Sequence, residues 1–284
     1  MSVLILGGQG NLGTQLSRIF SGSLAWDRED LDFLNFPLLE EKIGQLRPEV
    51  IINAVAYNAV DKCEQDSEEL DLAYKLNRDL PESLARIAIA IGATLLHYSS
   101  DYVFSGDLNK PKFKEDDPVN PVNKYGASKA AGEEAIRRIA AESSLSYFII
   151  RTSKLFGPRG ASPLSKSSFF DIMLDLAQNK EEIKVVDEES SCFTYTPDLA
   201  RATQALLQSP HPAGIYHITN SQAANWFEAA QTLFEIKGLN PRLIAIKGAD
   251  LNRPARRPLY SILENNNLPN LRAWPEALKE YLNL

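Results

Sequence analysis

The chain has 284 residues, of which 44% are hydrophobic and 24% are charged, a composition typical of one or two globular domains and not of a disordered protein. The formal net charge of −7 excludes the overall basic character of most nucleic-acid-binding proteins, so we expect no nucleic-acid partner. No apolar segment is long enough to span a membrane, and no secretory signal is visible. We expect a cytoplasmic protein whose two cysteines, Cys63 and Cys192, are free thiols.

Short apolar segments alternate with helical patterns through the first half of the chain. The predicted strands are residues 3–6, 50–52, 94–98 and 147–150. The predicted helices include residues 12–20, 38–46 and 128–139. Strands that alternate with helices predict an α/β fold, a doubly wound parallel sheet of the Rossmann type with helices on both faces.

The sequence changes in character after residue 152. Segment 158–168 is rich in Gly, Pro and Ser and is predicted to be a loop. The later predicted elements are helices at 169–176, 199–207, 226–234 and 277–282, and strands at 183–186 and 214–219. We expect residues 1–152 plus about 193–220 to form a dinucleotide-binding domain, and residues 153–192 plus about 221–284 to form a smaller C-terminal α/β substrate-binding lobe.

Three glycines follow the first predicted strand. Gly7, Gly10 and Gly13 have G-x-x-G-x-x-G spacing between a strand and a helix, where glycines permit a tight turn and let backbone approach a pyrophosphate. An acid roughly 20 residues on holds the adenosine ribose in such folds, and Asp27 fits this position. Its neighbour Arg28 either holds a 2′-phosphate or forms a solvated pair with Asp27, so NADP is favoured and NAD stays open.

A tyrosine and a lysine four residues apart form the second signal. Tyr125 and Lys129 share one face of a predicted helix, and an ammonium near the phenol would lower the tyrosine pKa. A tyrosine tuned in this way can protonate a carbonyl oxygen as hydride arrives. Ser99 or Ser100, at the end of the strand before it, would hydrogen-bond the same carbonyl.

The chain resembles the extended short-chain dehydrogenase/reductase family and, within it, the dTDP-4-dehydrorhamnose reductases. The segments that carry the resemblance span nearly the whole chain. They are residues 7–13, 53–62, 98–104, 125–129, 151–153, 214–217 and 254–258.

The resemblance implies a role for each matching position. It implies Ser100, Tyr125 and Lys129 as the catalytic residues. The implied cofactor-binding residues are Gly7, Gly10, Asn11, Leu12, Gly13, Asp27, Arg28, Asp32, Phe33, Val55, Ala56, Tyr57, Tyr98, Tyr125 and Lys129. The implied substrate-binding residues are Asn58, Val60, Ser100, Asp101, Lys154, Ser168 and Arg257. The implied reaction is NAD(P)H-dependent reduction of the 4-keto group of a nucleotide-linked deoxysugar, as in dTDP-L-rhamnose biosynthesis.

Several substrate-side positions depart from that family pattern. Ser100 replaces a Thr, Asn58 a small Thr, Lys154 a Trp, Ser168 an Asn, and residues 188–194 replace a segment usually containing Gln and Gly. Because pocket contacts set specificity, these changes leave open whether the substrate is dTDP-4-dehydrorhamnose itself.

The sequence leaves two other functions open. A nucleotide-sugar epimerase or dehydratase with bound NAD is one alternative, and a non-catalytic NADP-binding regulatory subunit is another. His97, His211 and His217 lack metal-ligand spacing, so we expect structural histidines and no metal. The charged residues 61–66 are expected to begin a solvated helix, Arg256 or Arg257 either clamps a phosphate or lies in a surface turn, and a homodimer is possible.

Overall fold

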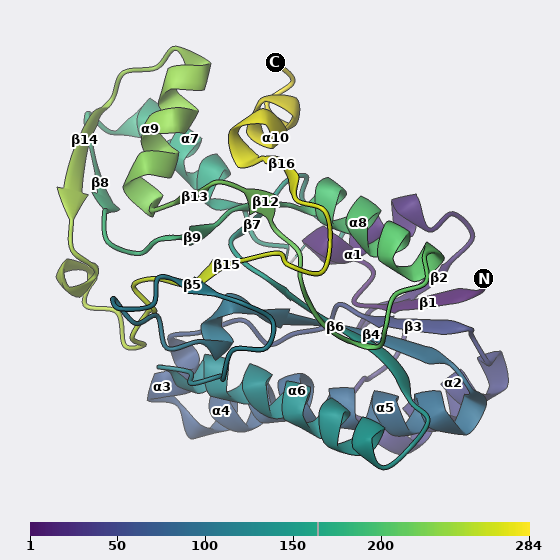
Figure 1. Ribbon diagram of the computed structural model, residues 1–284. Coiled ribbons are helices and arrows are strands. Elements are labelled where there is room, and N and C mark those ends of the chain that lie inside the picture. Colours follow the sequence, from purple (N-terminus) through teal and green to yellow (C-terminus); the bar gives the residue numbers. More distant parts are fainter. Residues whose placement is uncertain (164) are drawn as a thin grey trace.

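Six parallel strands form the centre of the protein, which a computed structural model describes at residues 1–163 and 165–284 (Figure 1). Every neighbouring pair in this sheet is parallel. In spatial order the strands are β2 (Leu24–Trp26), β1 (Val3–Leu6), β3 (Val50–Asn53), β4 (Thr94–Ser100), β6 (Ser146–Thr152) and β11 (Gly214–His217). This arrangement confirms the predicted doubly wound Rossmann fold.

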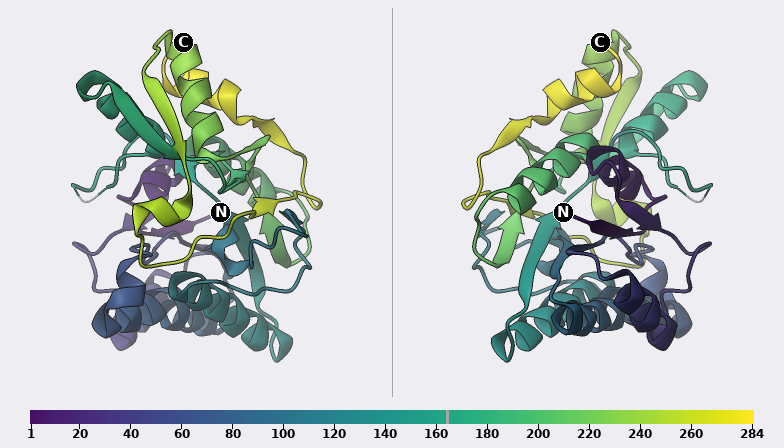
Figure 2. Two further views of the ribbon diagram at one scale, coloured as in Figure 1. Left: turned by 90° about the vertical axis from the view of Figure 1, so that its left-hand side faces the viewer. Right: turned by 90° about the vertical axis from the view of Figure 1, so that its right-hand side faces the viewer.

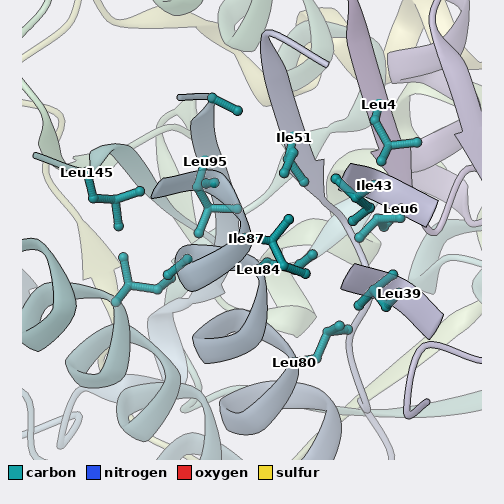
Figure 3. Packing of buried hydrophobic residues seen from close by; sticks show 14 of the residues in the cluster. Leu4, Leu6, Leu39, Ile43, Ile51, Leu80, Leu84, Ile87, Leu95 and Leu145 are labelled. Carbon is teal, nitrogen blue, oxygen red and sulfur yellow. The ribbon is translucent and has the colours of Figure 1, made fainter. Parts of the chain in front are cut away.

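Helices cover both faces of the sheet, as the fully apolar strands require. Because side chains alternate along a strand, Leu4 and Leu6 face one layer while Val3 and Ile5 face the other. The first layer, drawn in Figure 3, contains α2 (Phe36–Leu46), α5 (Leu80–Ile91) and α6 (Lys124–Ala141). The second contains α1 (Asn11–Ile19) and α8 (Thr196–Gln208).

A third hydrophobic cluster holds the later segments together. Its buried side chains, among them Phe170, Phe193 and Trp274, come from elements far apart in sequence. Figure 2 shows these elements grouped beside the sheet: α7 (Phe169–Asn179), α9 (Trp226–Lys237), α10 (Trp274–Tyr281) and the parallel pair β8 (Glu182–Val186) and β14 (Arg242–Ile246). The exact limits of a two-lobe division remain our proposal.

The remaining elements are short. Near the sheet they are α3 (Lys62–Gln65), α4 (Ser67–Tyr74), the π-helix η1 (Lys75–Asp79), the 3₁₀ helix η2 (Asp101–Val103) and β5 (Lys112–Phe113). Later in the chain they are β7 (Leu155–Phe156), β9 (Ser191–Cys192), β10 (Thr194–Tyr195), β12 (Asn220–Ser221), β13 (Ala223–Ala224), the 3₁₀ helix η3 (Gly248–Leu251), β15 (Ile262–Leu263) and β16 (Leu271–Ala273).

Helix α6 begins four residues before its predicted start. Asn123 caps it, because its side chain accepts a hydrogen bond from Gly126 N at 2.7 Å. Tyr125 therefore lies in the first turn, and Lys129 lies one turn later on the same helix.

Two further expectations can be compared with the described residues. Cys63 and Cys192 are both buried, and both are free thiols. Among residues 1–163 and 165–284, no helix has the length and apolar character needed to cross a bilayer.

Candidate functional site

The glycine loop makes a tight turn between β1 and α1. Gly7 has φ +82°, and the N–H groups of Gly7 and Gly8 both donate to Trp26 O, at 2.8 and 3.0 Å. A Cβ atom added at Gly13 would lie 1.9 Å from Gly7 O, so only glycine lets the first turn of α1 pack this closely.

Packing around the Cα of Gly10 is looser than at Gly13. A Cβ added at Gly10 would meet only Gly7 O, at an ordinary 3.4 Å, so packing within the protein does not require glycine there. Gly10 is also the N-cap of α1, and no side chain caps this helix. A helix start without a side-chain cap leaves backbone N–H groups that suit an anion.

Asp27 links the end of β2 to the glycine loop. Its carboxylate accepts hydrogen bonds from Gln9 N and Arg28 N, both at 2.9 Å. The exposed Arg28 side chain lies beside it, with Nε 3.8 Å from Asp27 Oδ1. Of the two predicted adenine neighbours, Asp32 is exposed and Phe33 is buried in the core under β1.

The Gly- and Ser-rich loop lies directly on the glycine loop. Gly160 N donates to Asn11 Oδ1 at 2.8 Å, and Asn11 Nδ2 donates to Lys166 O at 2.9 Å. Ser162 N donates to Gln9 O at 3.0 Å. The sequence predicted a loop here, but this contact across about 150 residues carried no sequence signal.

Lys166 also reaches the segment that follows β3. Its Nζ donates to Asn58 Oδ1 at 2.8 Å, so the predicted substrate residue Asn58 lies beside this loop. In the same segment, Val55 N donates to Asn53 Oδ1, and Tyr57 donates its phenolic hydrogen to Glu69. Ala56 is exposed and Val60 is half-buried.

Ser100 and Tyr125 meet at the carboxyl end of β4. Ser100 Oγ donates to Asp101 Oδ1 at 3.1 Å and accepts from Tyr102 N at 3.2 Å. Burial raises the pKa of Tyr125 to about 12, while a hydrogen bond from Ser100 acts in the opposite direction. The Tyr102 ring packs edge-on against the Tyr125 ring, with centroids 5.8 Å apart. The phenol is thus protonated at neutral pH.

Lys129 does not act on Tyr125 as the spacing alone suggested. Its Nζ donates to Tyr98 O at 2.6 Å and lies 3.4 Å from His97 Nε2. Burial lowers its pKa to about 8, and Lys129 is not among the groups that shift the pKa of Tyr125. The expectation that Lys129 lowers the pKa of Tyr125 is therefore wrong, because Lys129 Nζ binds the backbone oxygen of Tyr98 on β4.

Asp101 lies in a buried cluster of hydroxyl groups. Ser191 Oγ and Ser261 Oγ donate to its Oδ2 at 2.9 and 2.6 Å, and Ser100 donates to the other oxygen. Burial raises the pKa of this carboxyl, and the hydrogen bonds oppose the shift. Asp101 is therefore held in place beside Ser100.

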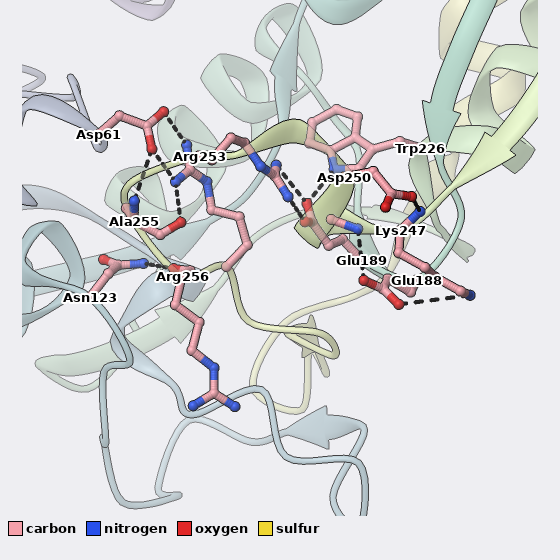
Figure 4. Close-up of polar contacts among 12 residues, drawn as sticks. Asp61, Asn123, Glu188, Glu189, Trp226, Lys247, Asp250, Arg253, Ala255 and Arg256 are labelled. Atoms are coloured by element: carbon pink, nitrogen blue, oxygen red, sulfur yellow. Dashed lines mark hydrogen bonds and ion pairs between the residues drawn. The ribbon is translucent and has the colours of Figure 1, made fainter.

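Lys154 lies among aromatic rings instead of in solvent. Its Nζ is 4.1 Å from the ring centre of Trp226 and 4.8 Å from that of Phe193, and it donates to Glu189 O at 2.8 Å. Burial lowers its pKa to about 8, with nearby carboxylates, first among them Asp101, opposing the shift. Figure 4 shows Glu189 accepting hydrogen bonds from Trp226 and Arg253.

Two other predicted substrate residues already have partners. Arg257 forms a bidentate pair with Asp61, with N–O distances of 2.7 and 2.8 Å. Asp61, the first residue of the charged segment 61–66, is therefore paired with Arg257, so this segment is not simply solvated. Ser168 caps α7, because its Oγ accepts from Asp171 N and the Asp171 carboxylate accepts from Ser168 N.

The structure brings Ser100, Tyr125 and Lys129 together along β4 and α6, and it places the glycine loop and Asp27 at the ends of β1 and β2, beyond β3. The predicted cofactor residue Tyr98 meets Lys129 only through its backbone oxygen, because its side chain lies on the opposite face of the sheet with its hydroxyl 2.6 Å from Thr203 Oγ1 on α8. The structure also adds Asn53 and His97, which are adjacent to this group. His97 was expected to be structural, and its contact with Lys129 depends on the pairing of β3, β4 and α6, which no local motif reveals.

Comparison with known proteins covers the whole chain. The family described as "RmlD substrate binding domain" matches residues 1–284. The chain is 35% identical to the spore coat polysaccharide biosynthesis protein SpsK of Bacillus subtilis over 99% of this chain and 96% of that protein. It is 34% identical to dTDP-4-dehydrorhamnose reductase of Streptomyces griseus over 98% of this chain and 91% of that protein.

A solved structure agrees with these sequence relationships. The dTDP-4-dehydrorhamnose reductase of Bacillus anthracis, in complex with NADP, superposes with a TM-score of 0.90 at 31% identity, covering 99% of this chain and 98% of that one. From the full-length match in sequence and fold, the chain belongs to the RmlD substrate-binding domain family.

Proposed function

We propose that this protein is an NADPH-dependent oxidoreductase that reduces the 4-keto group of a nucleotide-linked deoxysugar. The observation that carries the proposal is the meeting of Ser100 and Tyr125 at the carboxyl end of β4, at the same edge of the sheet as the dinucleotide turn after β1, from which β3 alone separates β4. In open parallel sheets this end of the strands lines the ligand crevice. Relatives named dTDP-4-dehydrorhamnose reductase support the reaction.

The residues present fit a dinucleotide. The glycine turn and the uncapped start of α1 would receive its pyrophosphate, and Asp27 would hold the adenosine ribose. The exposed Arg28 is placed to meet a 2′-phosphate, which favours NADP over NAD, and the B. anthracis relative binds NADP. When bound, the nicotinamide supplies the hydride.

The protein residues supply the proton and orient the ketone. Ser100 Oγ, which accepts from Tyr102 N, would turn its single hydrogen from Asp101 Oδ1 to the ketone oxygen. Tyr125 stays protonated because burial raises its pKa to about 12, so it would donate its proton to the oxygen as the alkoxide forms.

We assign the sugar nucleotide to the side of the crevice next to Asn58, Val60 and Lys154. Lys154 is held by Trp226 and Glu189, so it would present a cation within an aromatic surface. Arg257 would contribute to phosphate binding only by sharing its bidentate bond with Asp61. We place the protein in the cytoplasm, where two free buried thiols persist.

The test is turnover with purified protein. NADPH consumption should be followed with dTDP-4-dehydrorhamnose and with other 4-keto sugar nucleotides, and the product identified by NMR. Tyr125→Phe should lower kcat by roughly 10²–10⁴-fold while NADPH still binds. Tyr102→Phe is the matched control, since it removes a neighbouring phenol and should leave kcat close to the wild-type value.

Other outcomes would identify the alternatives. Conversion of the sugar without net NADPH consumption would indicate an epimerase or dehydratase. NADPH binding without turnover of any sugar nucleotide would indicate a regulatory subunit. Wild-type activity in Tyr125→Phe would remove the assigned proton donor.

A further inference from the structure

A buried row of polar groups runs from the segment after β3 to Lys129. Asn53 and His97 are directly opposite each other in the β3–β4 pairing, so their side chains lie on one face of the sheet. Asn53 and His97 are 0% exposed, and Lys129 is 1% exposed. With no solvent to satisfy them, these side chains must satisfy one another's hydrogen bonds.

The first contact fixes the orientation of the Asn53 amide. Val55 N donates to Asn53 Oδ1 at 3.1 Å, which assigns that atom as the oxygen. Asn53 Nδ2 therefore faces His97 Nδ1, 3.1 Å away. An amide NH₂ group can only donate, so His97 Nδ1 must be the acceptor, and the ring hydrogen must be on Nε2.

That hydrogen points at the catalytic lysine. His97 Nε2 lies 3.4 Å from Lys129 Nζ, and Tyr98 O accepts one hydrogen from Nζ at 2.6 Å. An ammonium group has three donors and no acceptor, so the Nε2 hydrogen would oppose it. A free amine has one lone pair, which can accept the hydrogen from His97.

Burial disfavours the ammonium form of Lys129, and the charge that opposes this effect is shared with another cation. Glu133, one turn further along α6, attracts a cation, but both its oxygens bind Arg151 on β6, at 2.9 and 2.6 Å. Tyr125, one turn earlier on α6, is an uncharged phenol. Burial and the nearby lysine lower the pKa of His97 well below 6.5, and burial lowers that of Lys129 to about 8.

We propose that Asn53 and His97 are positioning residues of the reductase, whose fixed tautomer stabilises the free-amine form of Lys129 relative to the ammonium form. This inference rests on the proposed function for its catalytic meaning. A lysine with both forms populated near the working pH can take up and release protons beside Tyr125, which an ordinary lysine cannot do. Asn53 also links the charge state of Lys129, through His97, to the backbone of Val55, whose N–H donates to Asn53 Oδ1.

The tautomer can be measured directly on the intact protein. The chain has only three histidines, so two-bond ¹H–¹⁵N spectra resolve each ring, and His97 is assigned by its loss in His97→Gln. We expect His97 to carry its hydrogen on Nε2 from pH 6 to pH 8 and not to titrate in that range. A hydrogen on Nδ1 in the wild-type protein would overturn the proposal.

The lysine is measured by its own titration, followed by NMR of ¹³C-labelled lysine and assigned with Lys129→Met. We expect a midpoint near 8 in the wild-type protein. His97→Gln can accept from Asn53 through Oε1 and turn its NH₂ toward Lys129, so the midpoint should stay within about half a unit. His97→Met has no donor, so the midpoint should rise by about one unit or more.

Asn53→Asp tests the direction of the hydrogen bonds that run from Asn53 through His97 to Lys129. A carboxylate accepts from His97 Nδ1–H, which moves the lone pair to Nε2, so the tautomer should invert and the Lys129 midpoint should rise. Asn77→Asp is the matched control, because it adds the same buried charge beside Ser128 without touching His97. It should leave the tautomer unchanged and shift the midpoint less than Asn53→Asp does.

The activity profile then connects the row to catalysis. In the dependence of kcat and kcat/KM on pH, the ionisation near 8 should move upward in His97→Met and stay in place in His97→Gln. An unchanged Lys129 midpoint in both His97→Met and Asn53→Asp would refute the inference. If a variant does not fold, the tautomer of His97 in the wild-type protein and the Lys129 midpoint in His97→Gln still test whether the inference holds. Absence of turnover would refute the proposed function and leave the NMR results standing.

Discussion

Arg151 and Glu133 form a buried ion pair one turn along α6 from Lys129. The Arg151 guanidinium binds both carboxylate oxygens, and the two side chains are only 2% and 3% exposed. Arg151 also donates to Glu115 O and lies 4.9 Å from the Phe104 ring centre. The pair joins β6 to α6, so it fixes the helix that carries Tyr125 and Lys129.

Glu133→Leu should destabilise the protein by about 3–5 kcal/mol, because it leaves the Arg151 charge buried without a partner. The double variant Glu133→Leu/Arg151→Met removes both charges and should recover most of that loss. Urea unfolding of the wild type, both single variants and the double variant gives the coupling energy. Equal losses in the single and double variants would show that packing, and not charge, holds α6 on β6.

For individual residues, the sequence identified those that share a local motif. Tyr125 and Lys129 are four apart on one helix, so their spacing alone predicted a common face. Asn53 and His97 are 44 residues apart and meet only through the β3–β4 register. Their contact could not be predicted, because a strand pairing is set by the whole sheet and not by either segment.

At the scale of elements, the turn from β1 into α1 depends on Gly13. A methyl group there would lie 1.9 Å from Gly7 O, so Gly13→Ala should separate α1 from the glycine loop. Overpacking of this kind costs about 1–3 kcal/mol, and a cost of that size in the bound state weakens NADPH binding by about 5- to 140-fold. Fluorescence titration with NADPH measures the effect.

Gly44 provides a control within another helix. It lies in α2, where an added Cβ would meet nothing within 4 Å. Gly44→Ala should therefore raise the free energy of unfolding by about 0.5–1 kcal/mol and leave NADPH affinity unchanged. If Gly13→Ala binds NADPH as the wild type does, the tight turn is not required for the dinucleotide.

The elements of the sheet were predicted because each is a continuous apolar segment, and β1 and β3 begin where the sequence indicated. The packing of loop 158–168 on the glycine loop was not predicted. Its contacts use backbone atoms of Gly160 and Lys166 with the side chain of Asn11, and such bonds leave no pattern in sequence. Loops that return to a distant segment are therefore visible only in the structure.

The whole molecule should lose stability as the pH falls below about 6.5, because two histidines are buried in their neutral form. Burial and Arg151 lower the pKa of His217 from 6.5 to about 4, and the pKa of His97 is also well below 6.5. The unfolded chain thus binds more protons than the folded chain between these limits, and stability falls with pH. His217 alone accounts for about 3 kcal/mol across the full window.

The contribution of His217 can be isolated by substitution. Its Nδ1 lies 3.0 Å from Glu264 O, and Gln can supply a donor to the same carbonyl. The buried Asp101 acts in the opposite sense, because its raised pKa lets the folded chain bind a proton, but this effect is common to wild type and variant.

In urea unfolding between pH 7.5 and pH 5, the free energy of unfolding of His217→Gln should therefore decline less steeply than that of the wild type. His211→Gln, in the half-buried connection before β11, is the control and should follow the wild-type slope. Equal slopes in all three proteins would mean that His217 carries a proton in the folded state, and then its closeness to Arg151 would have to be relieved by a shift of β11 against β6.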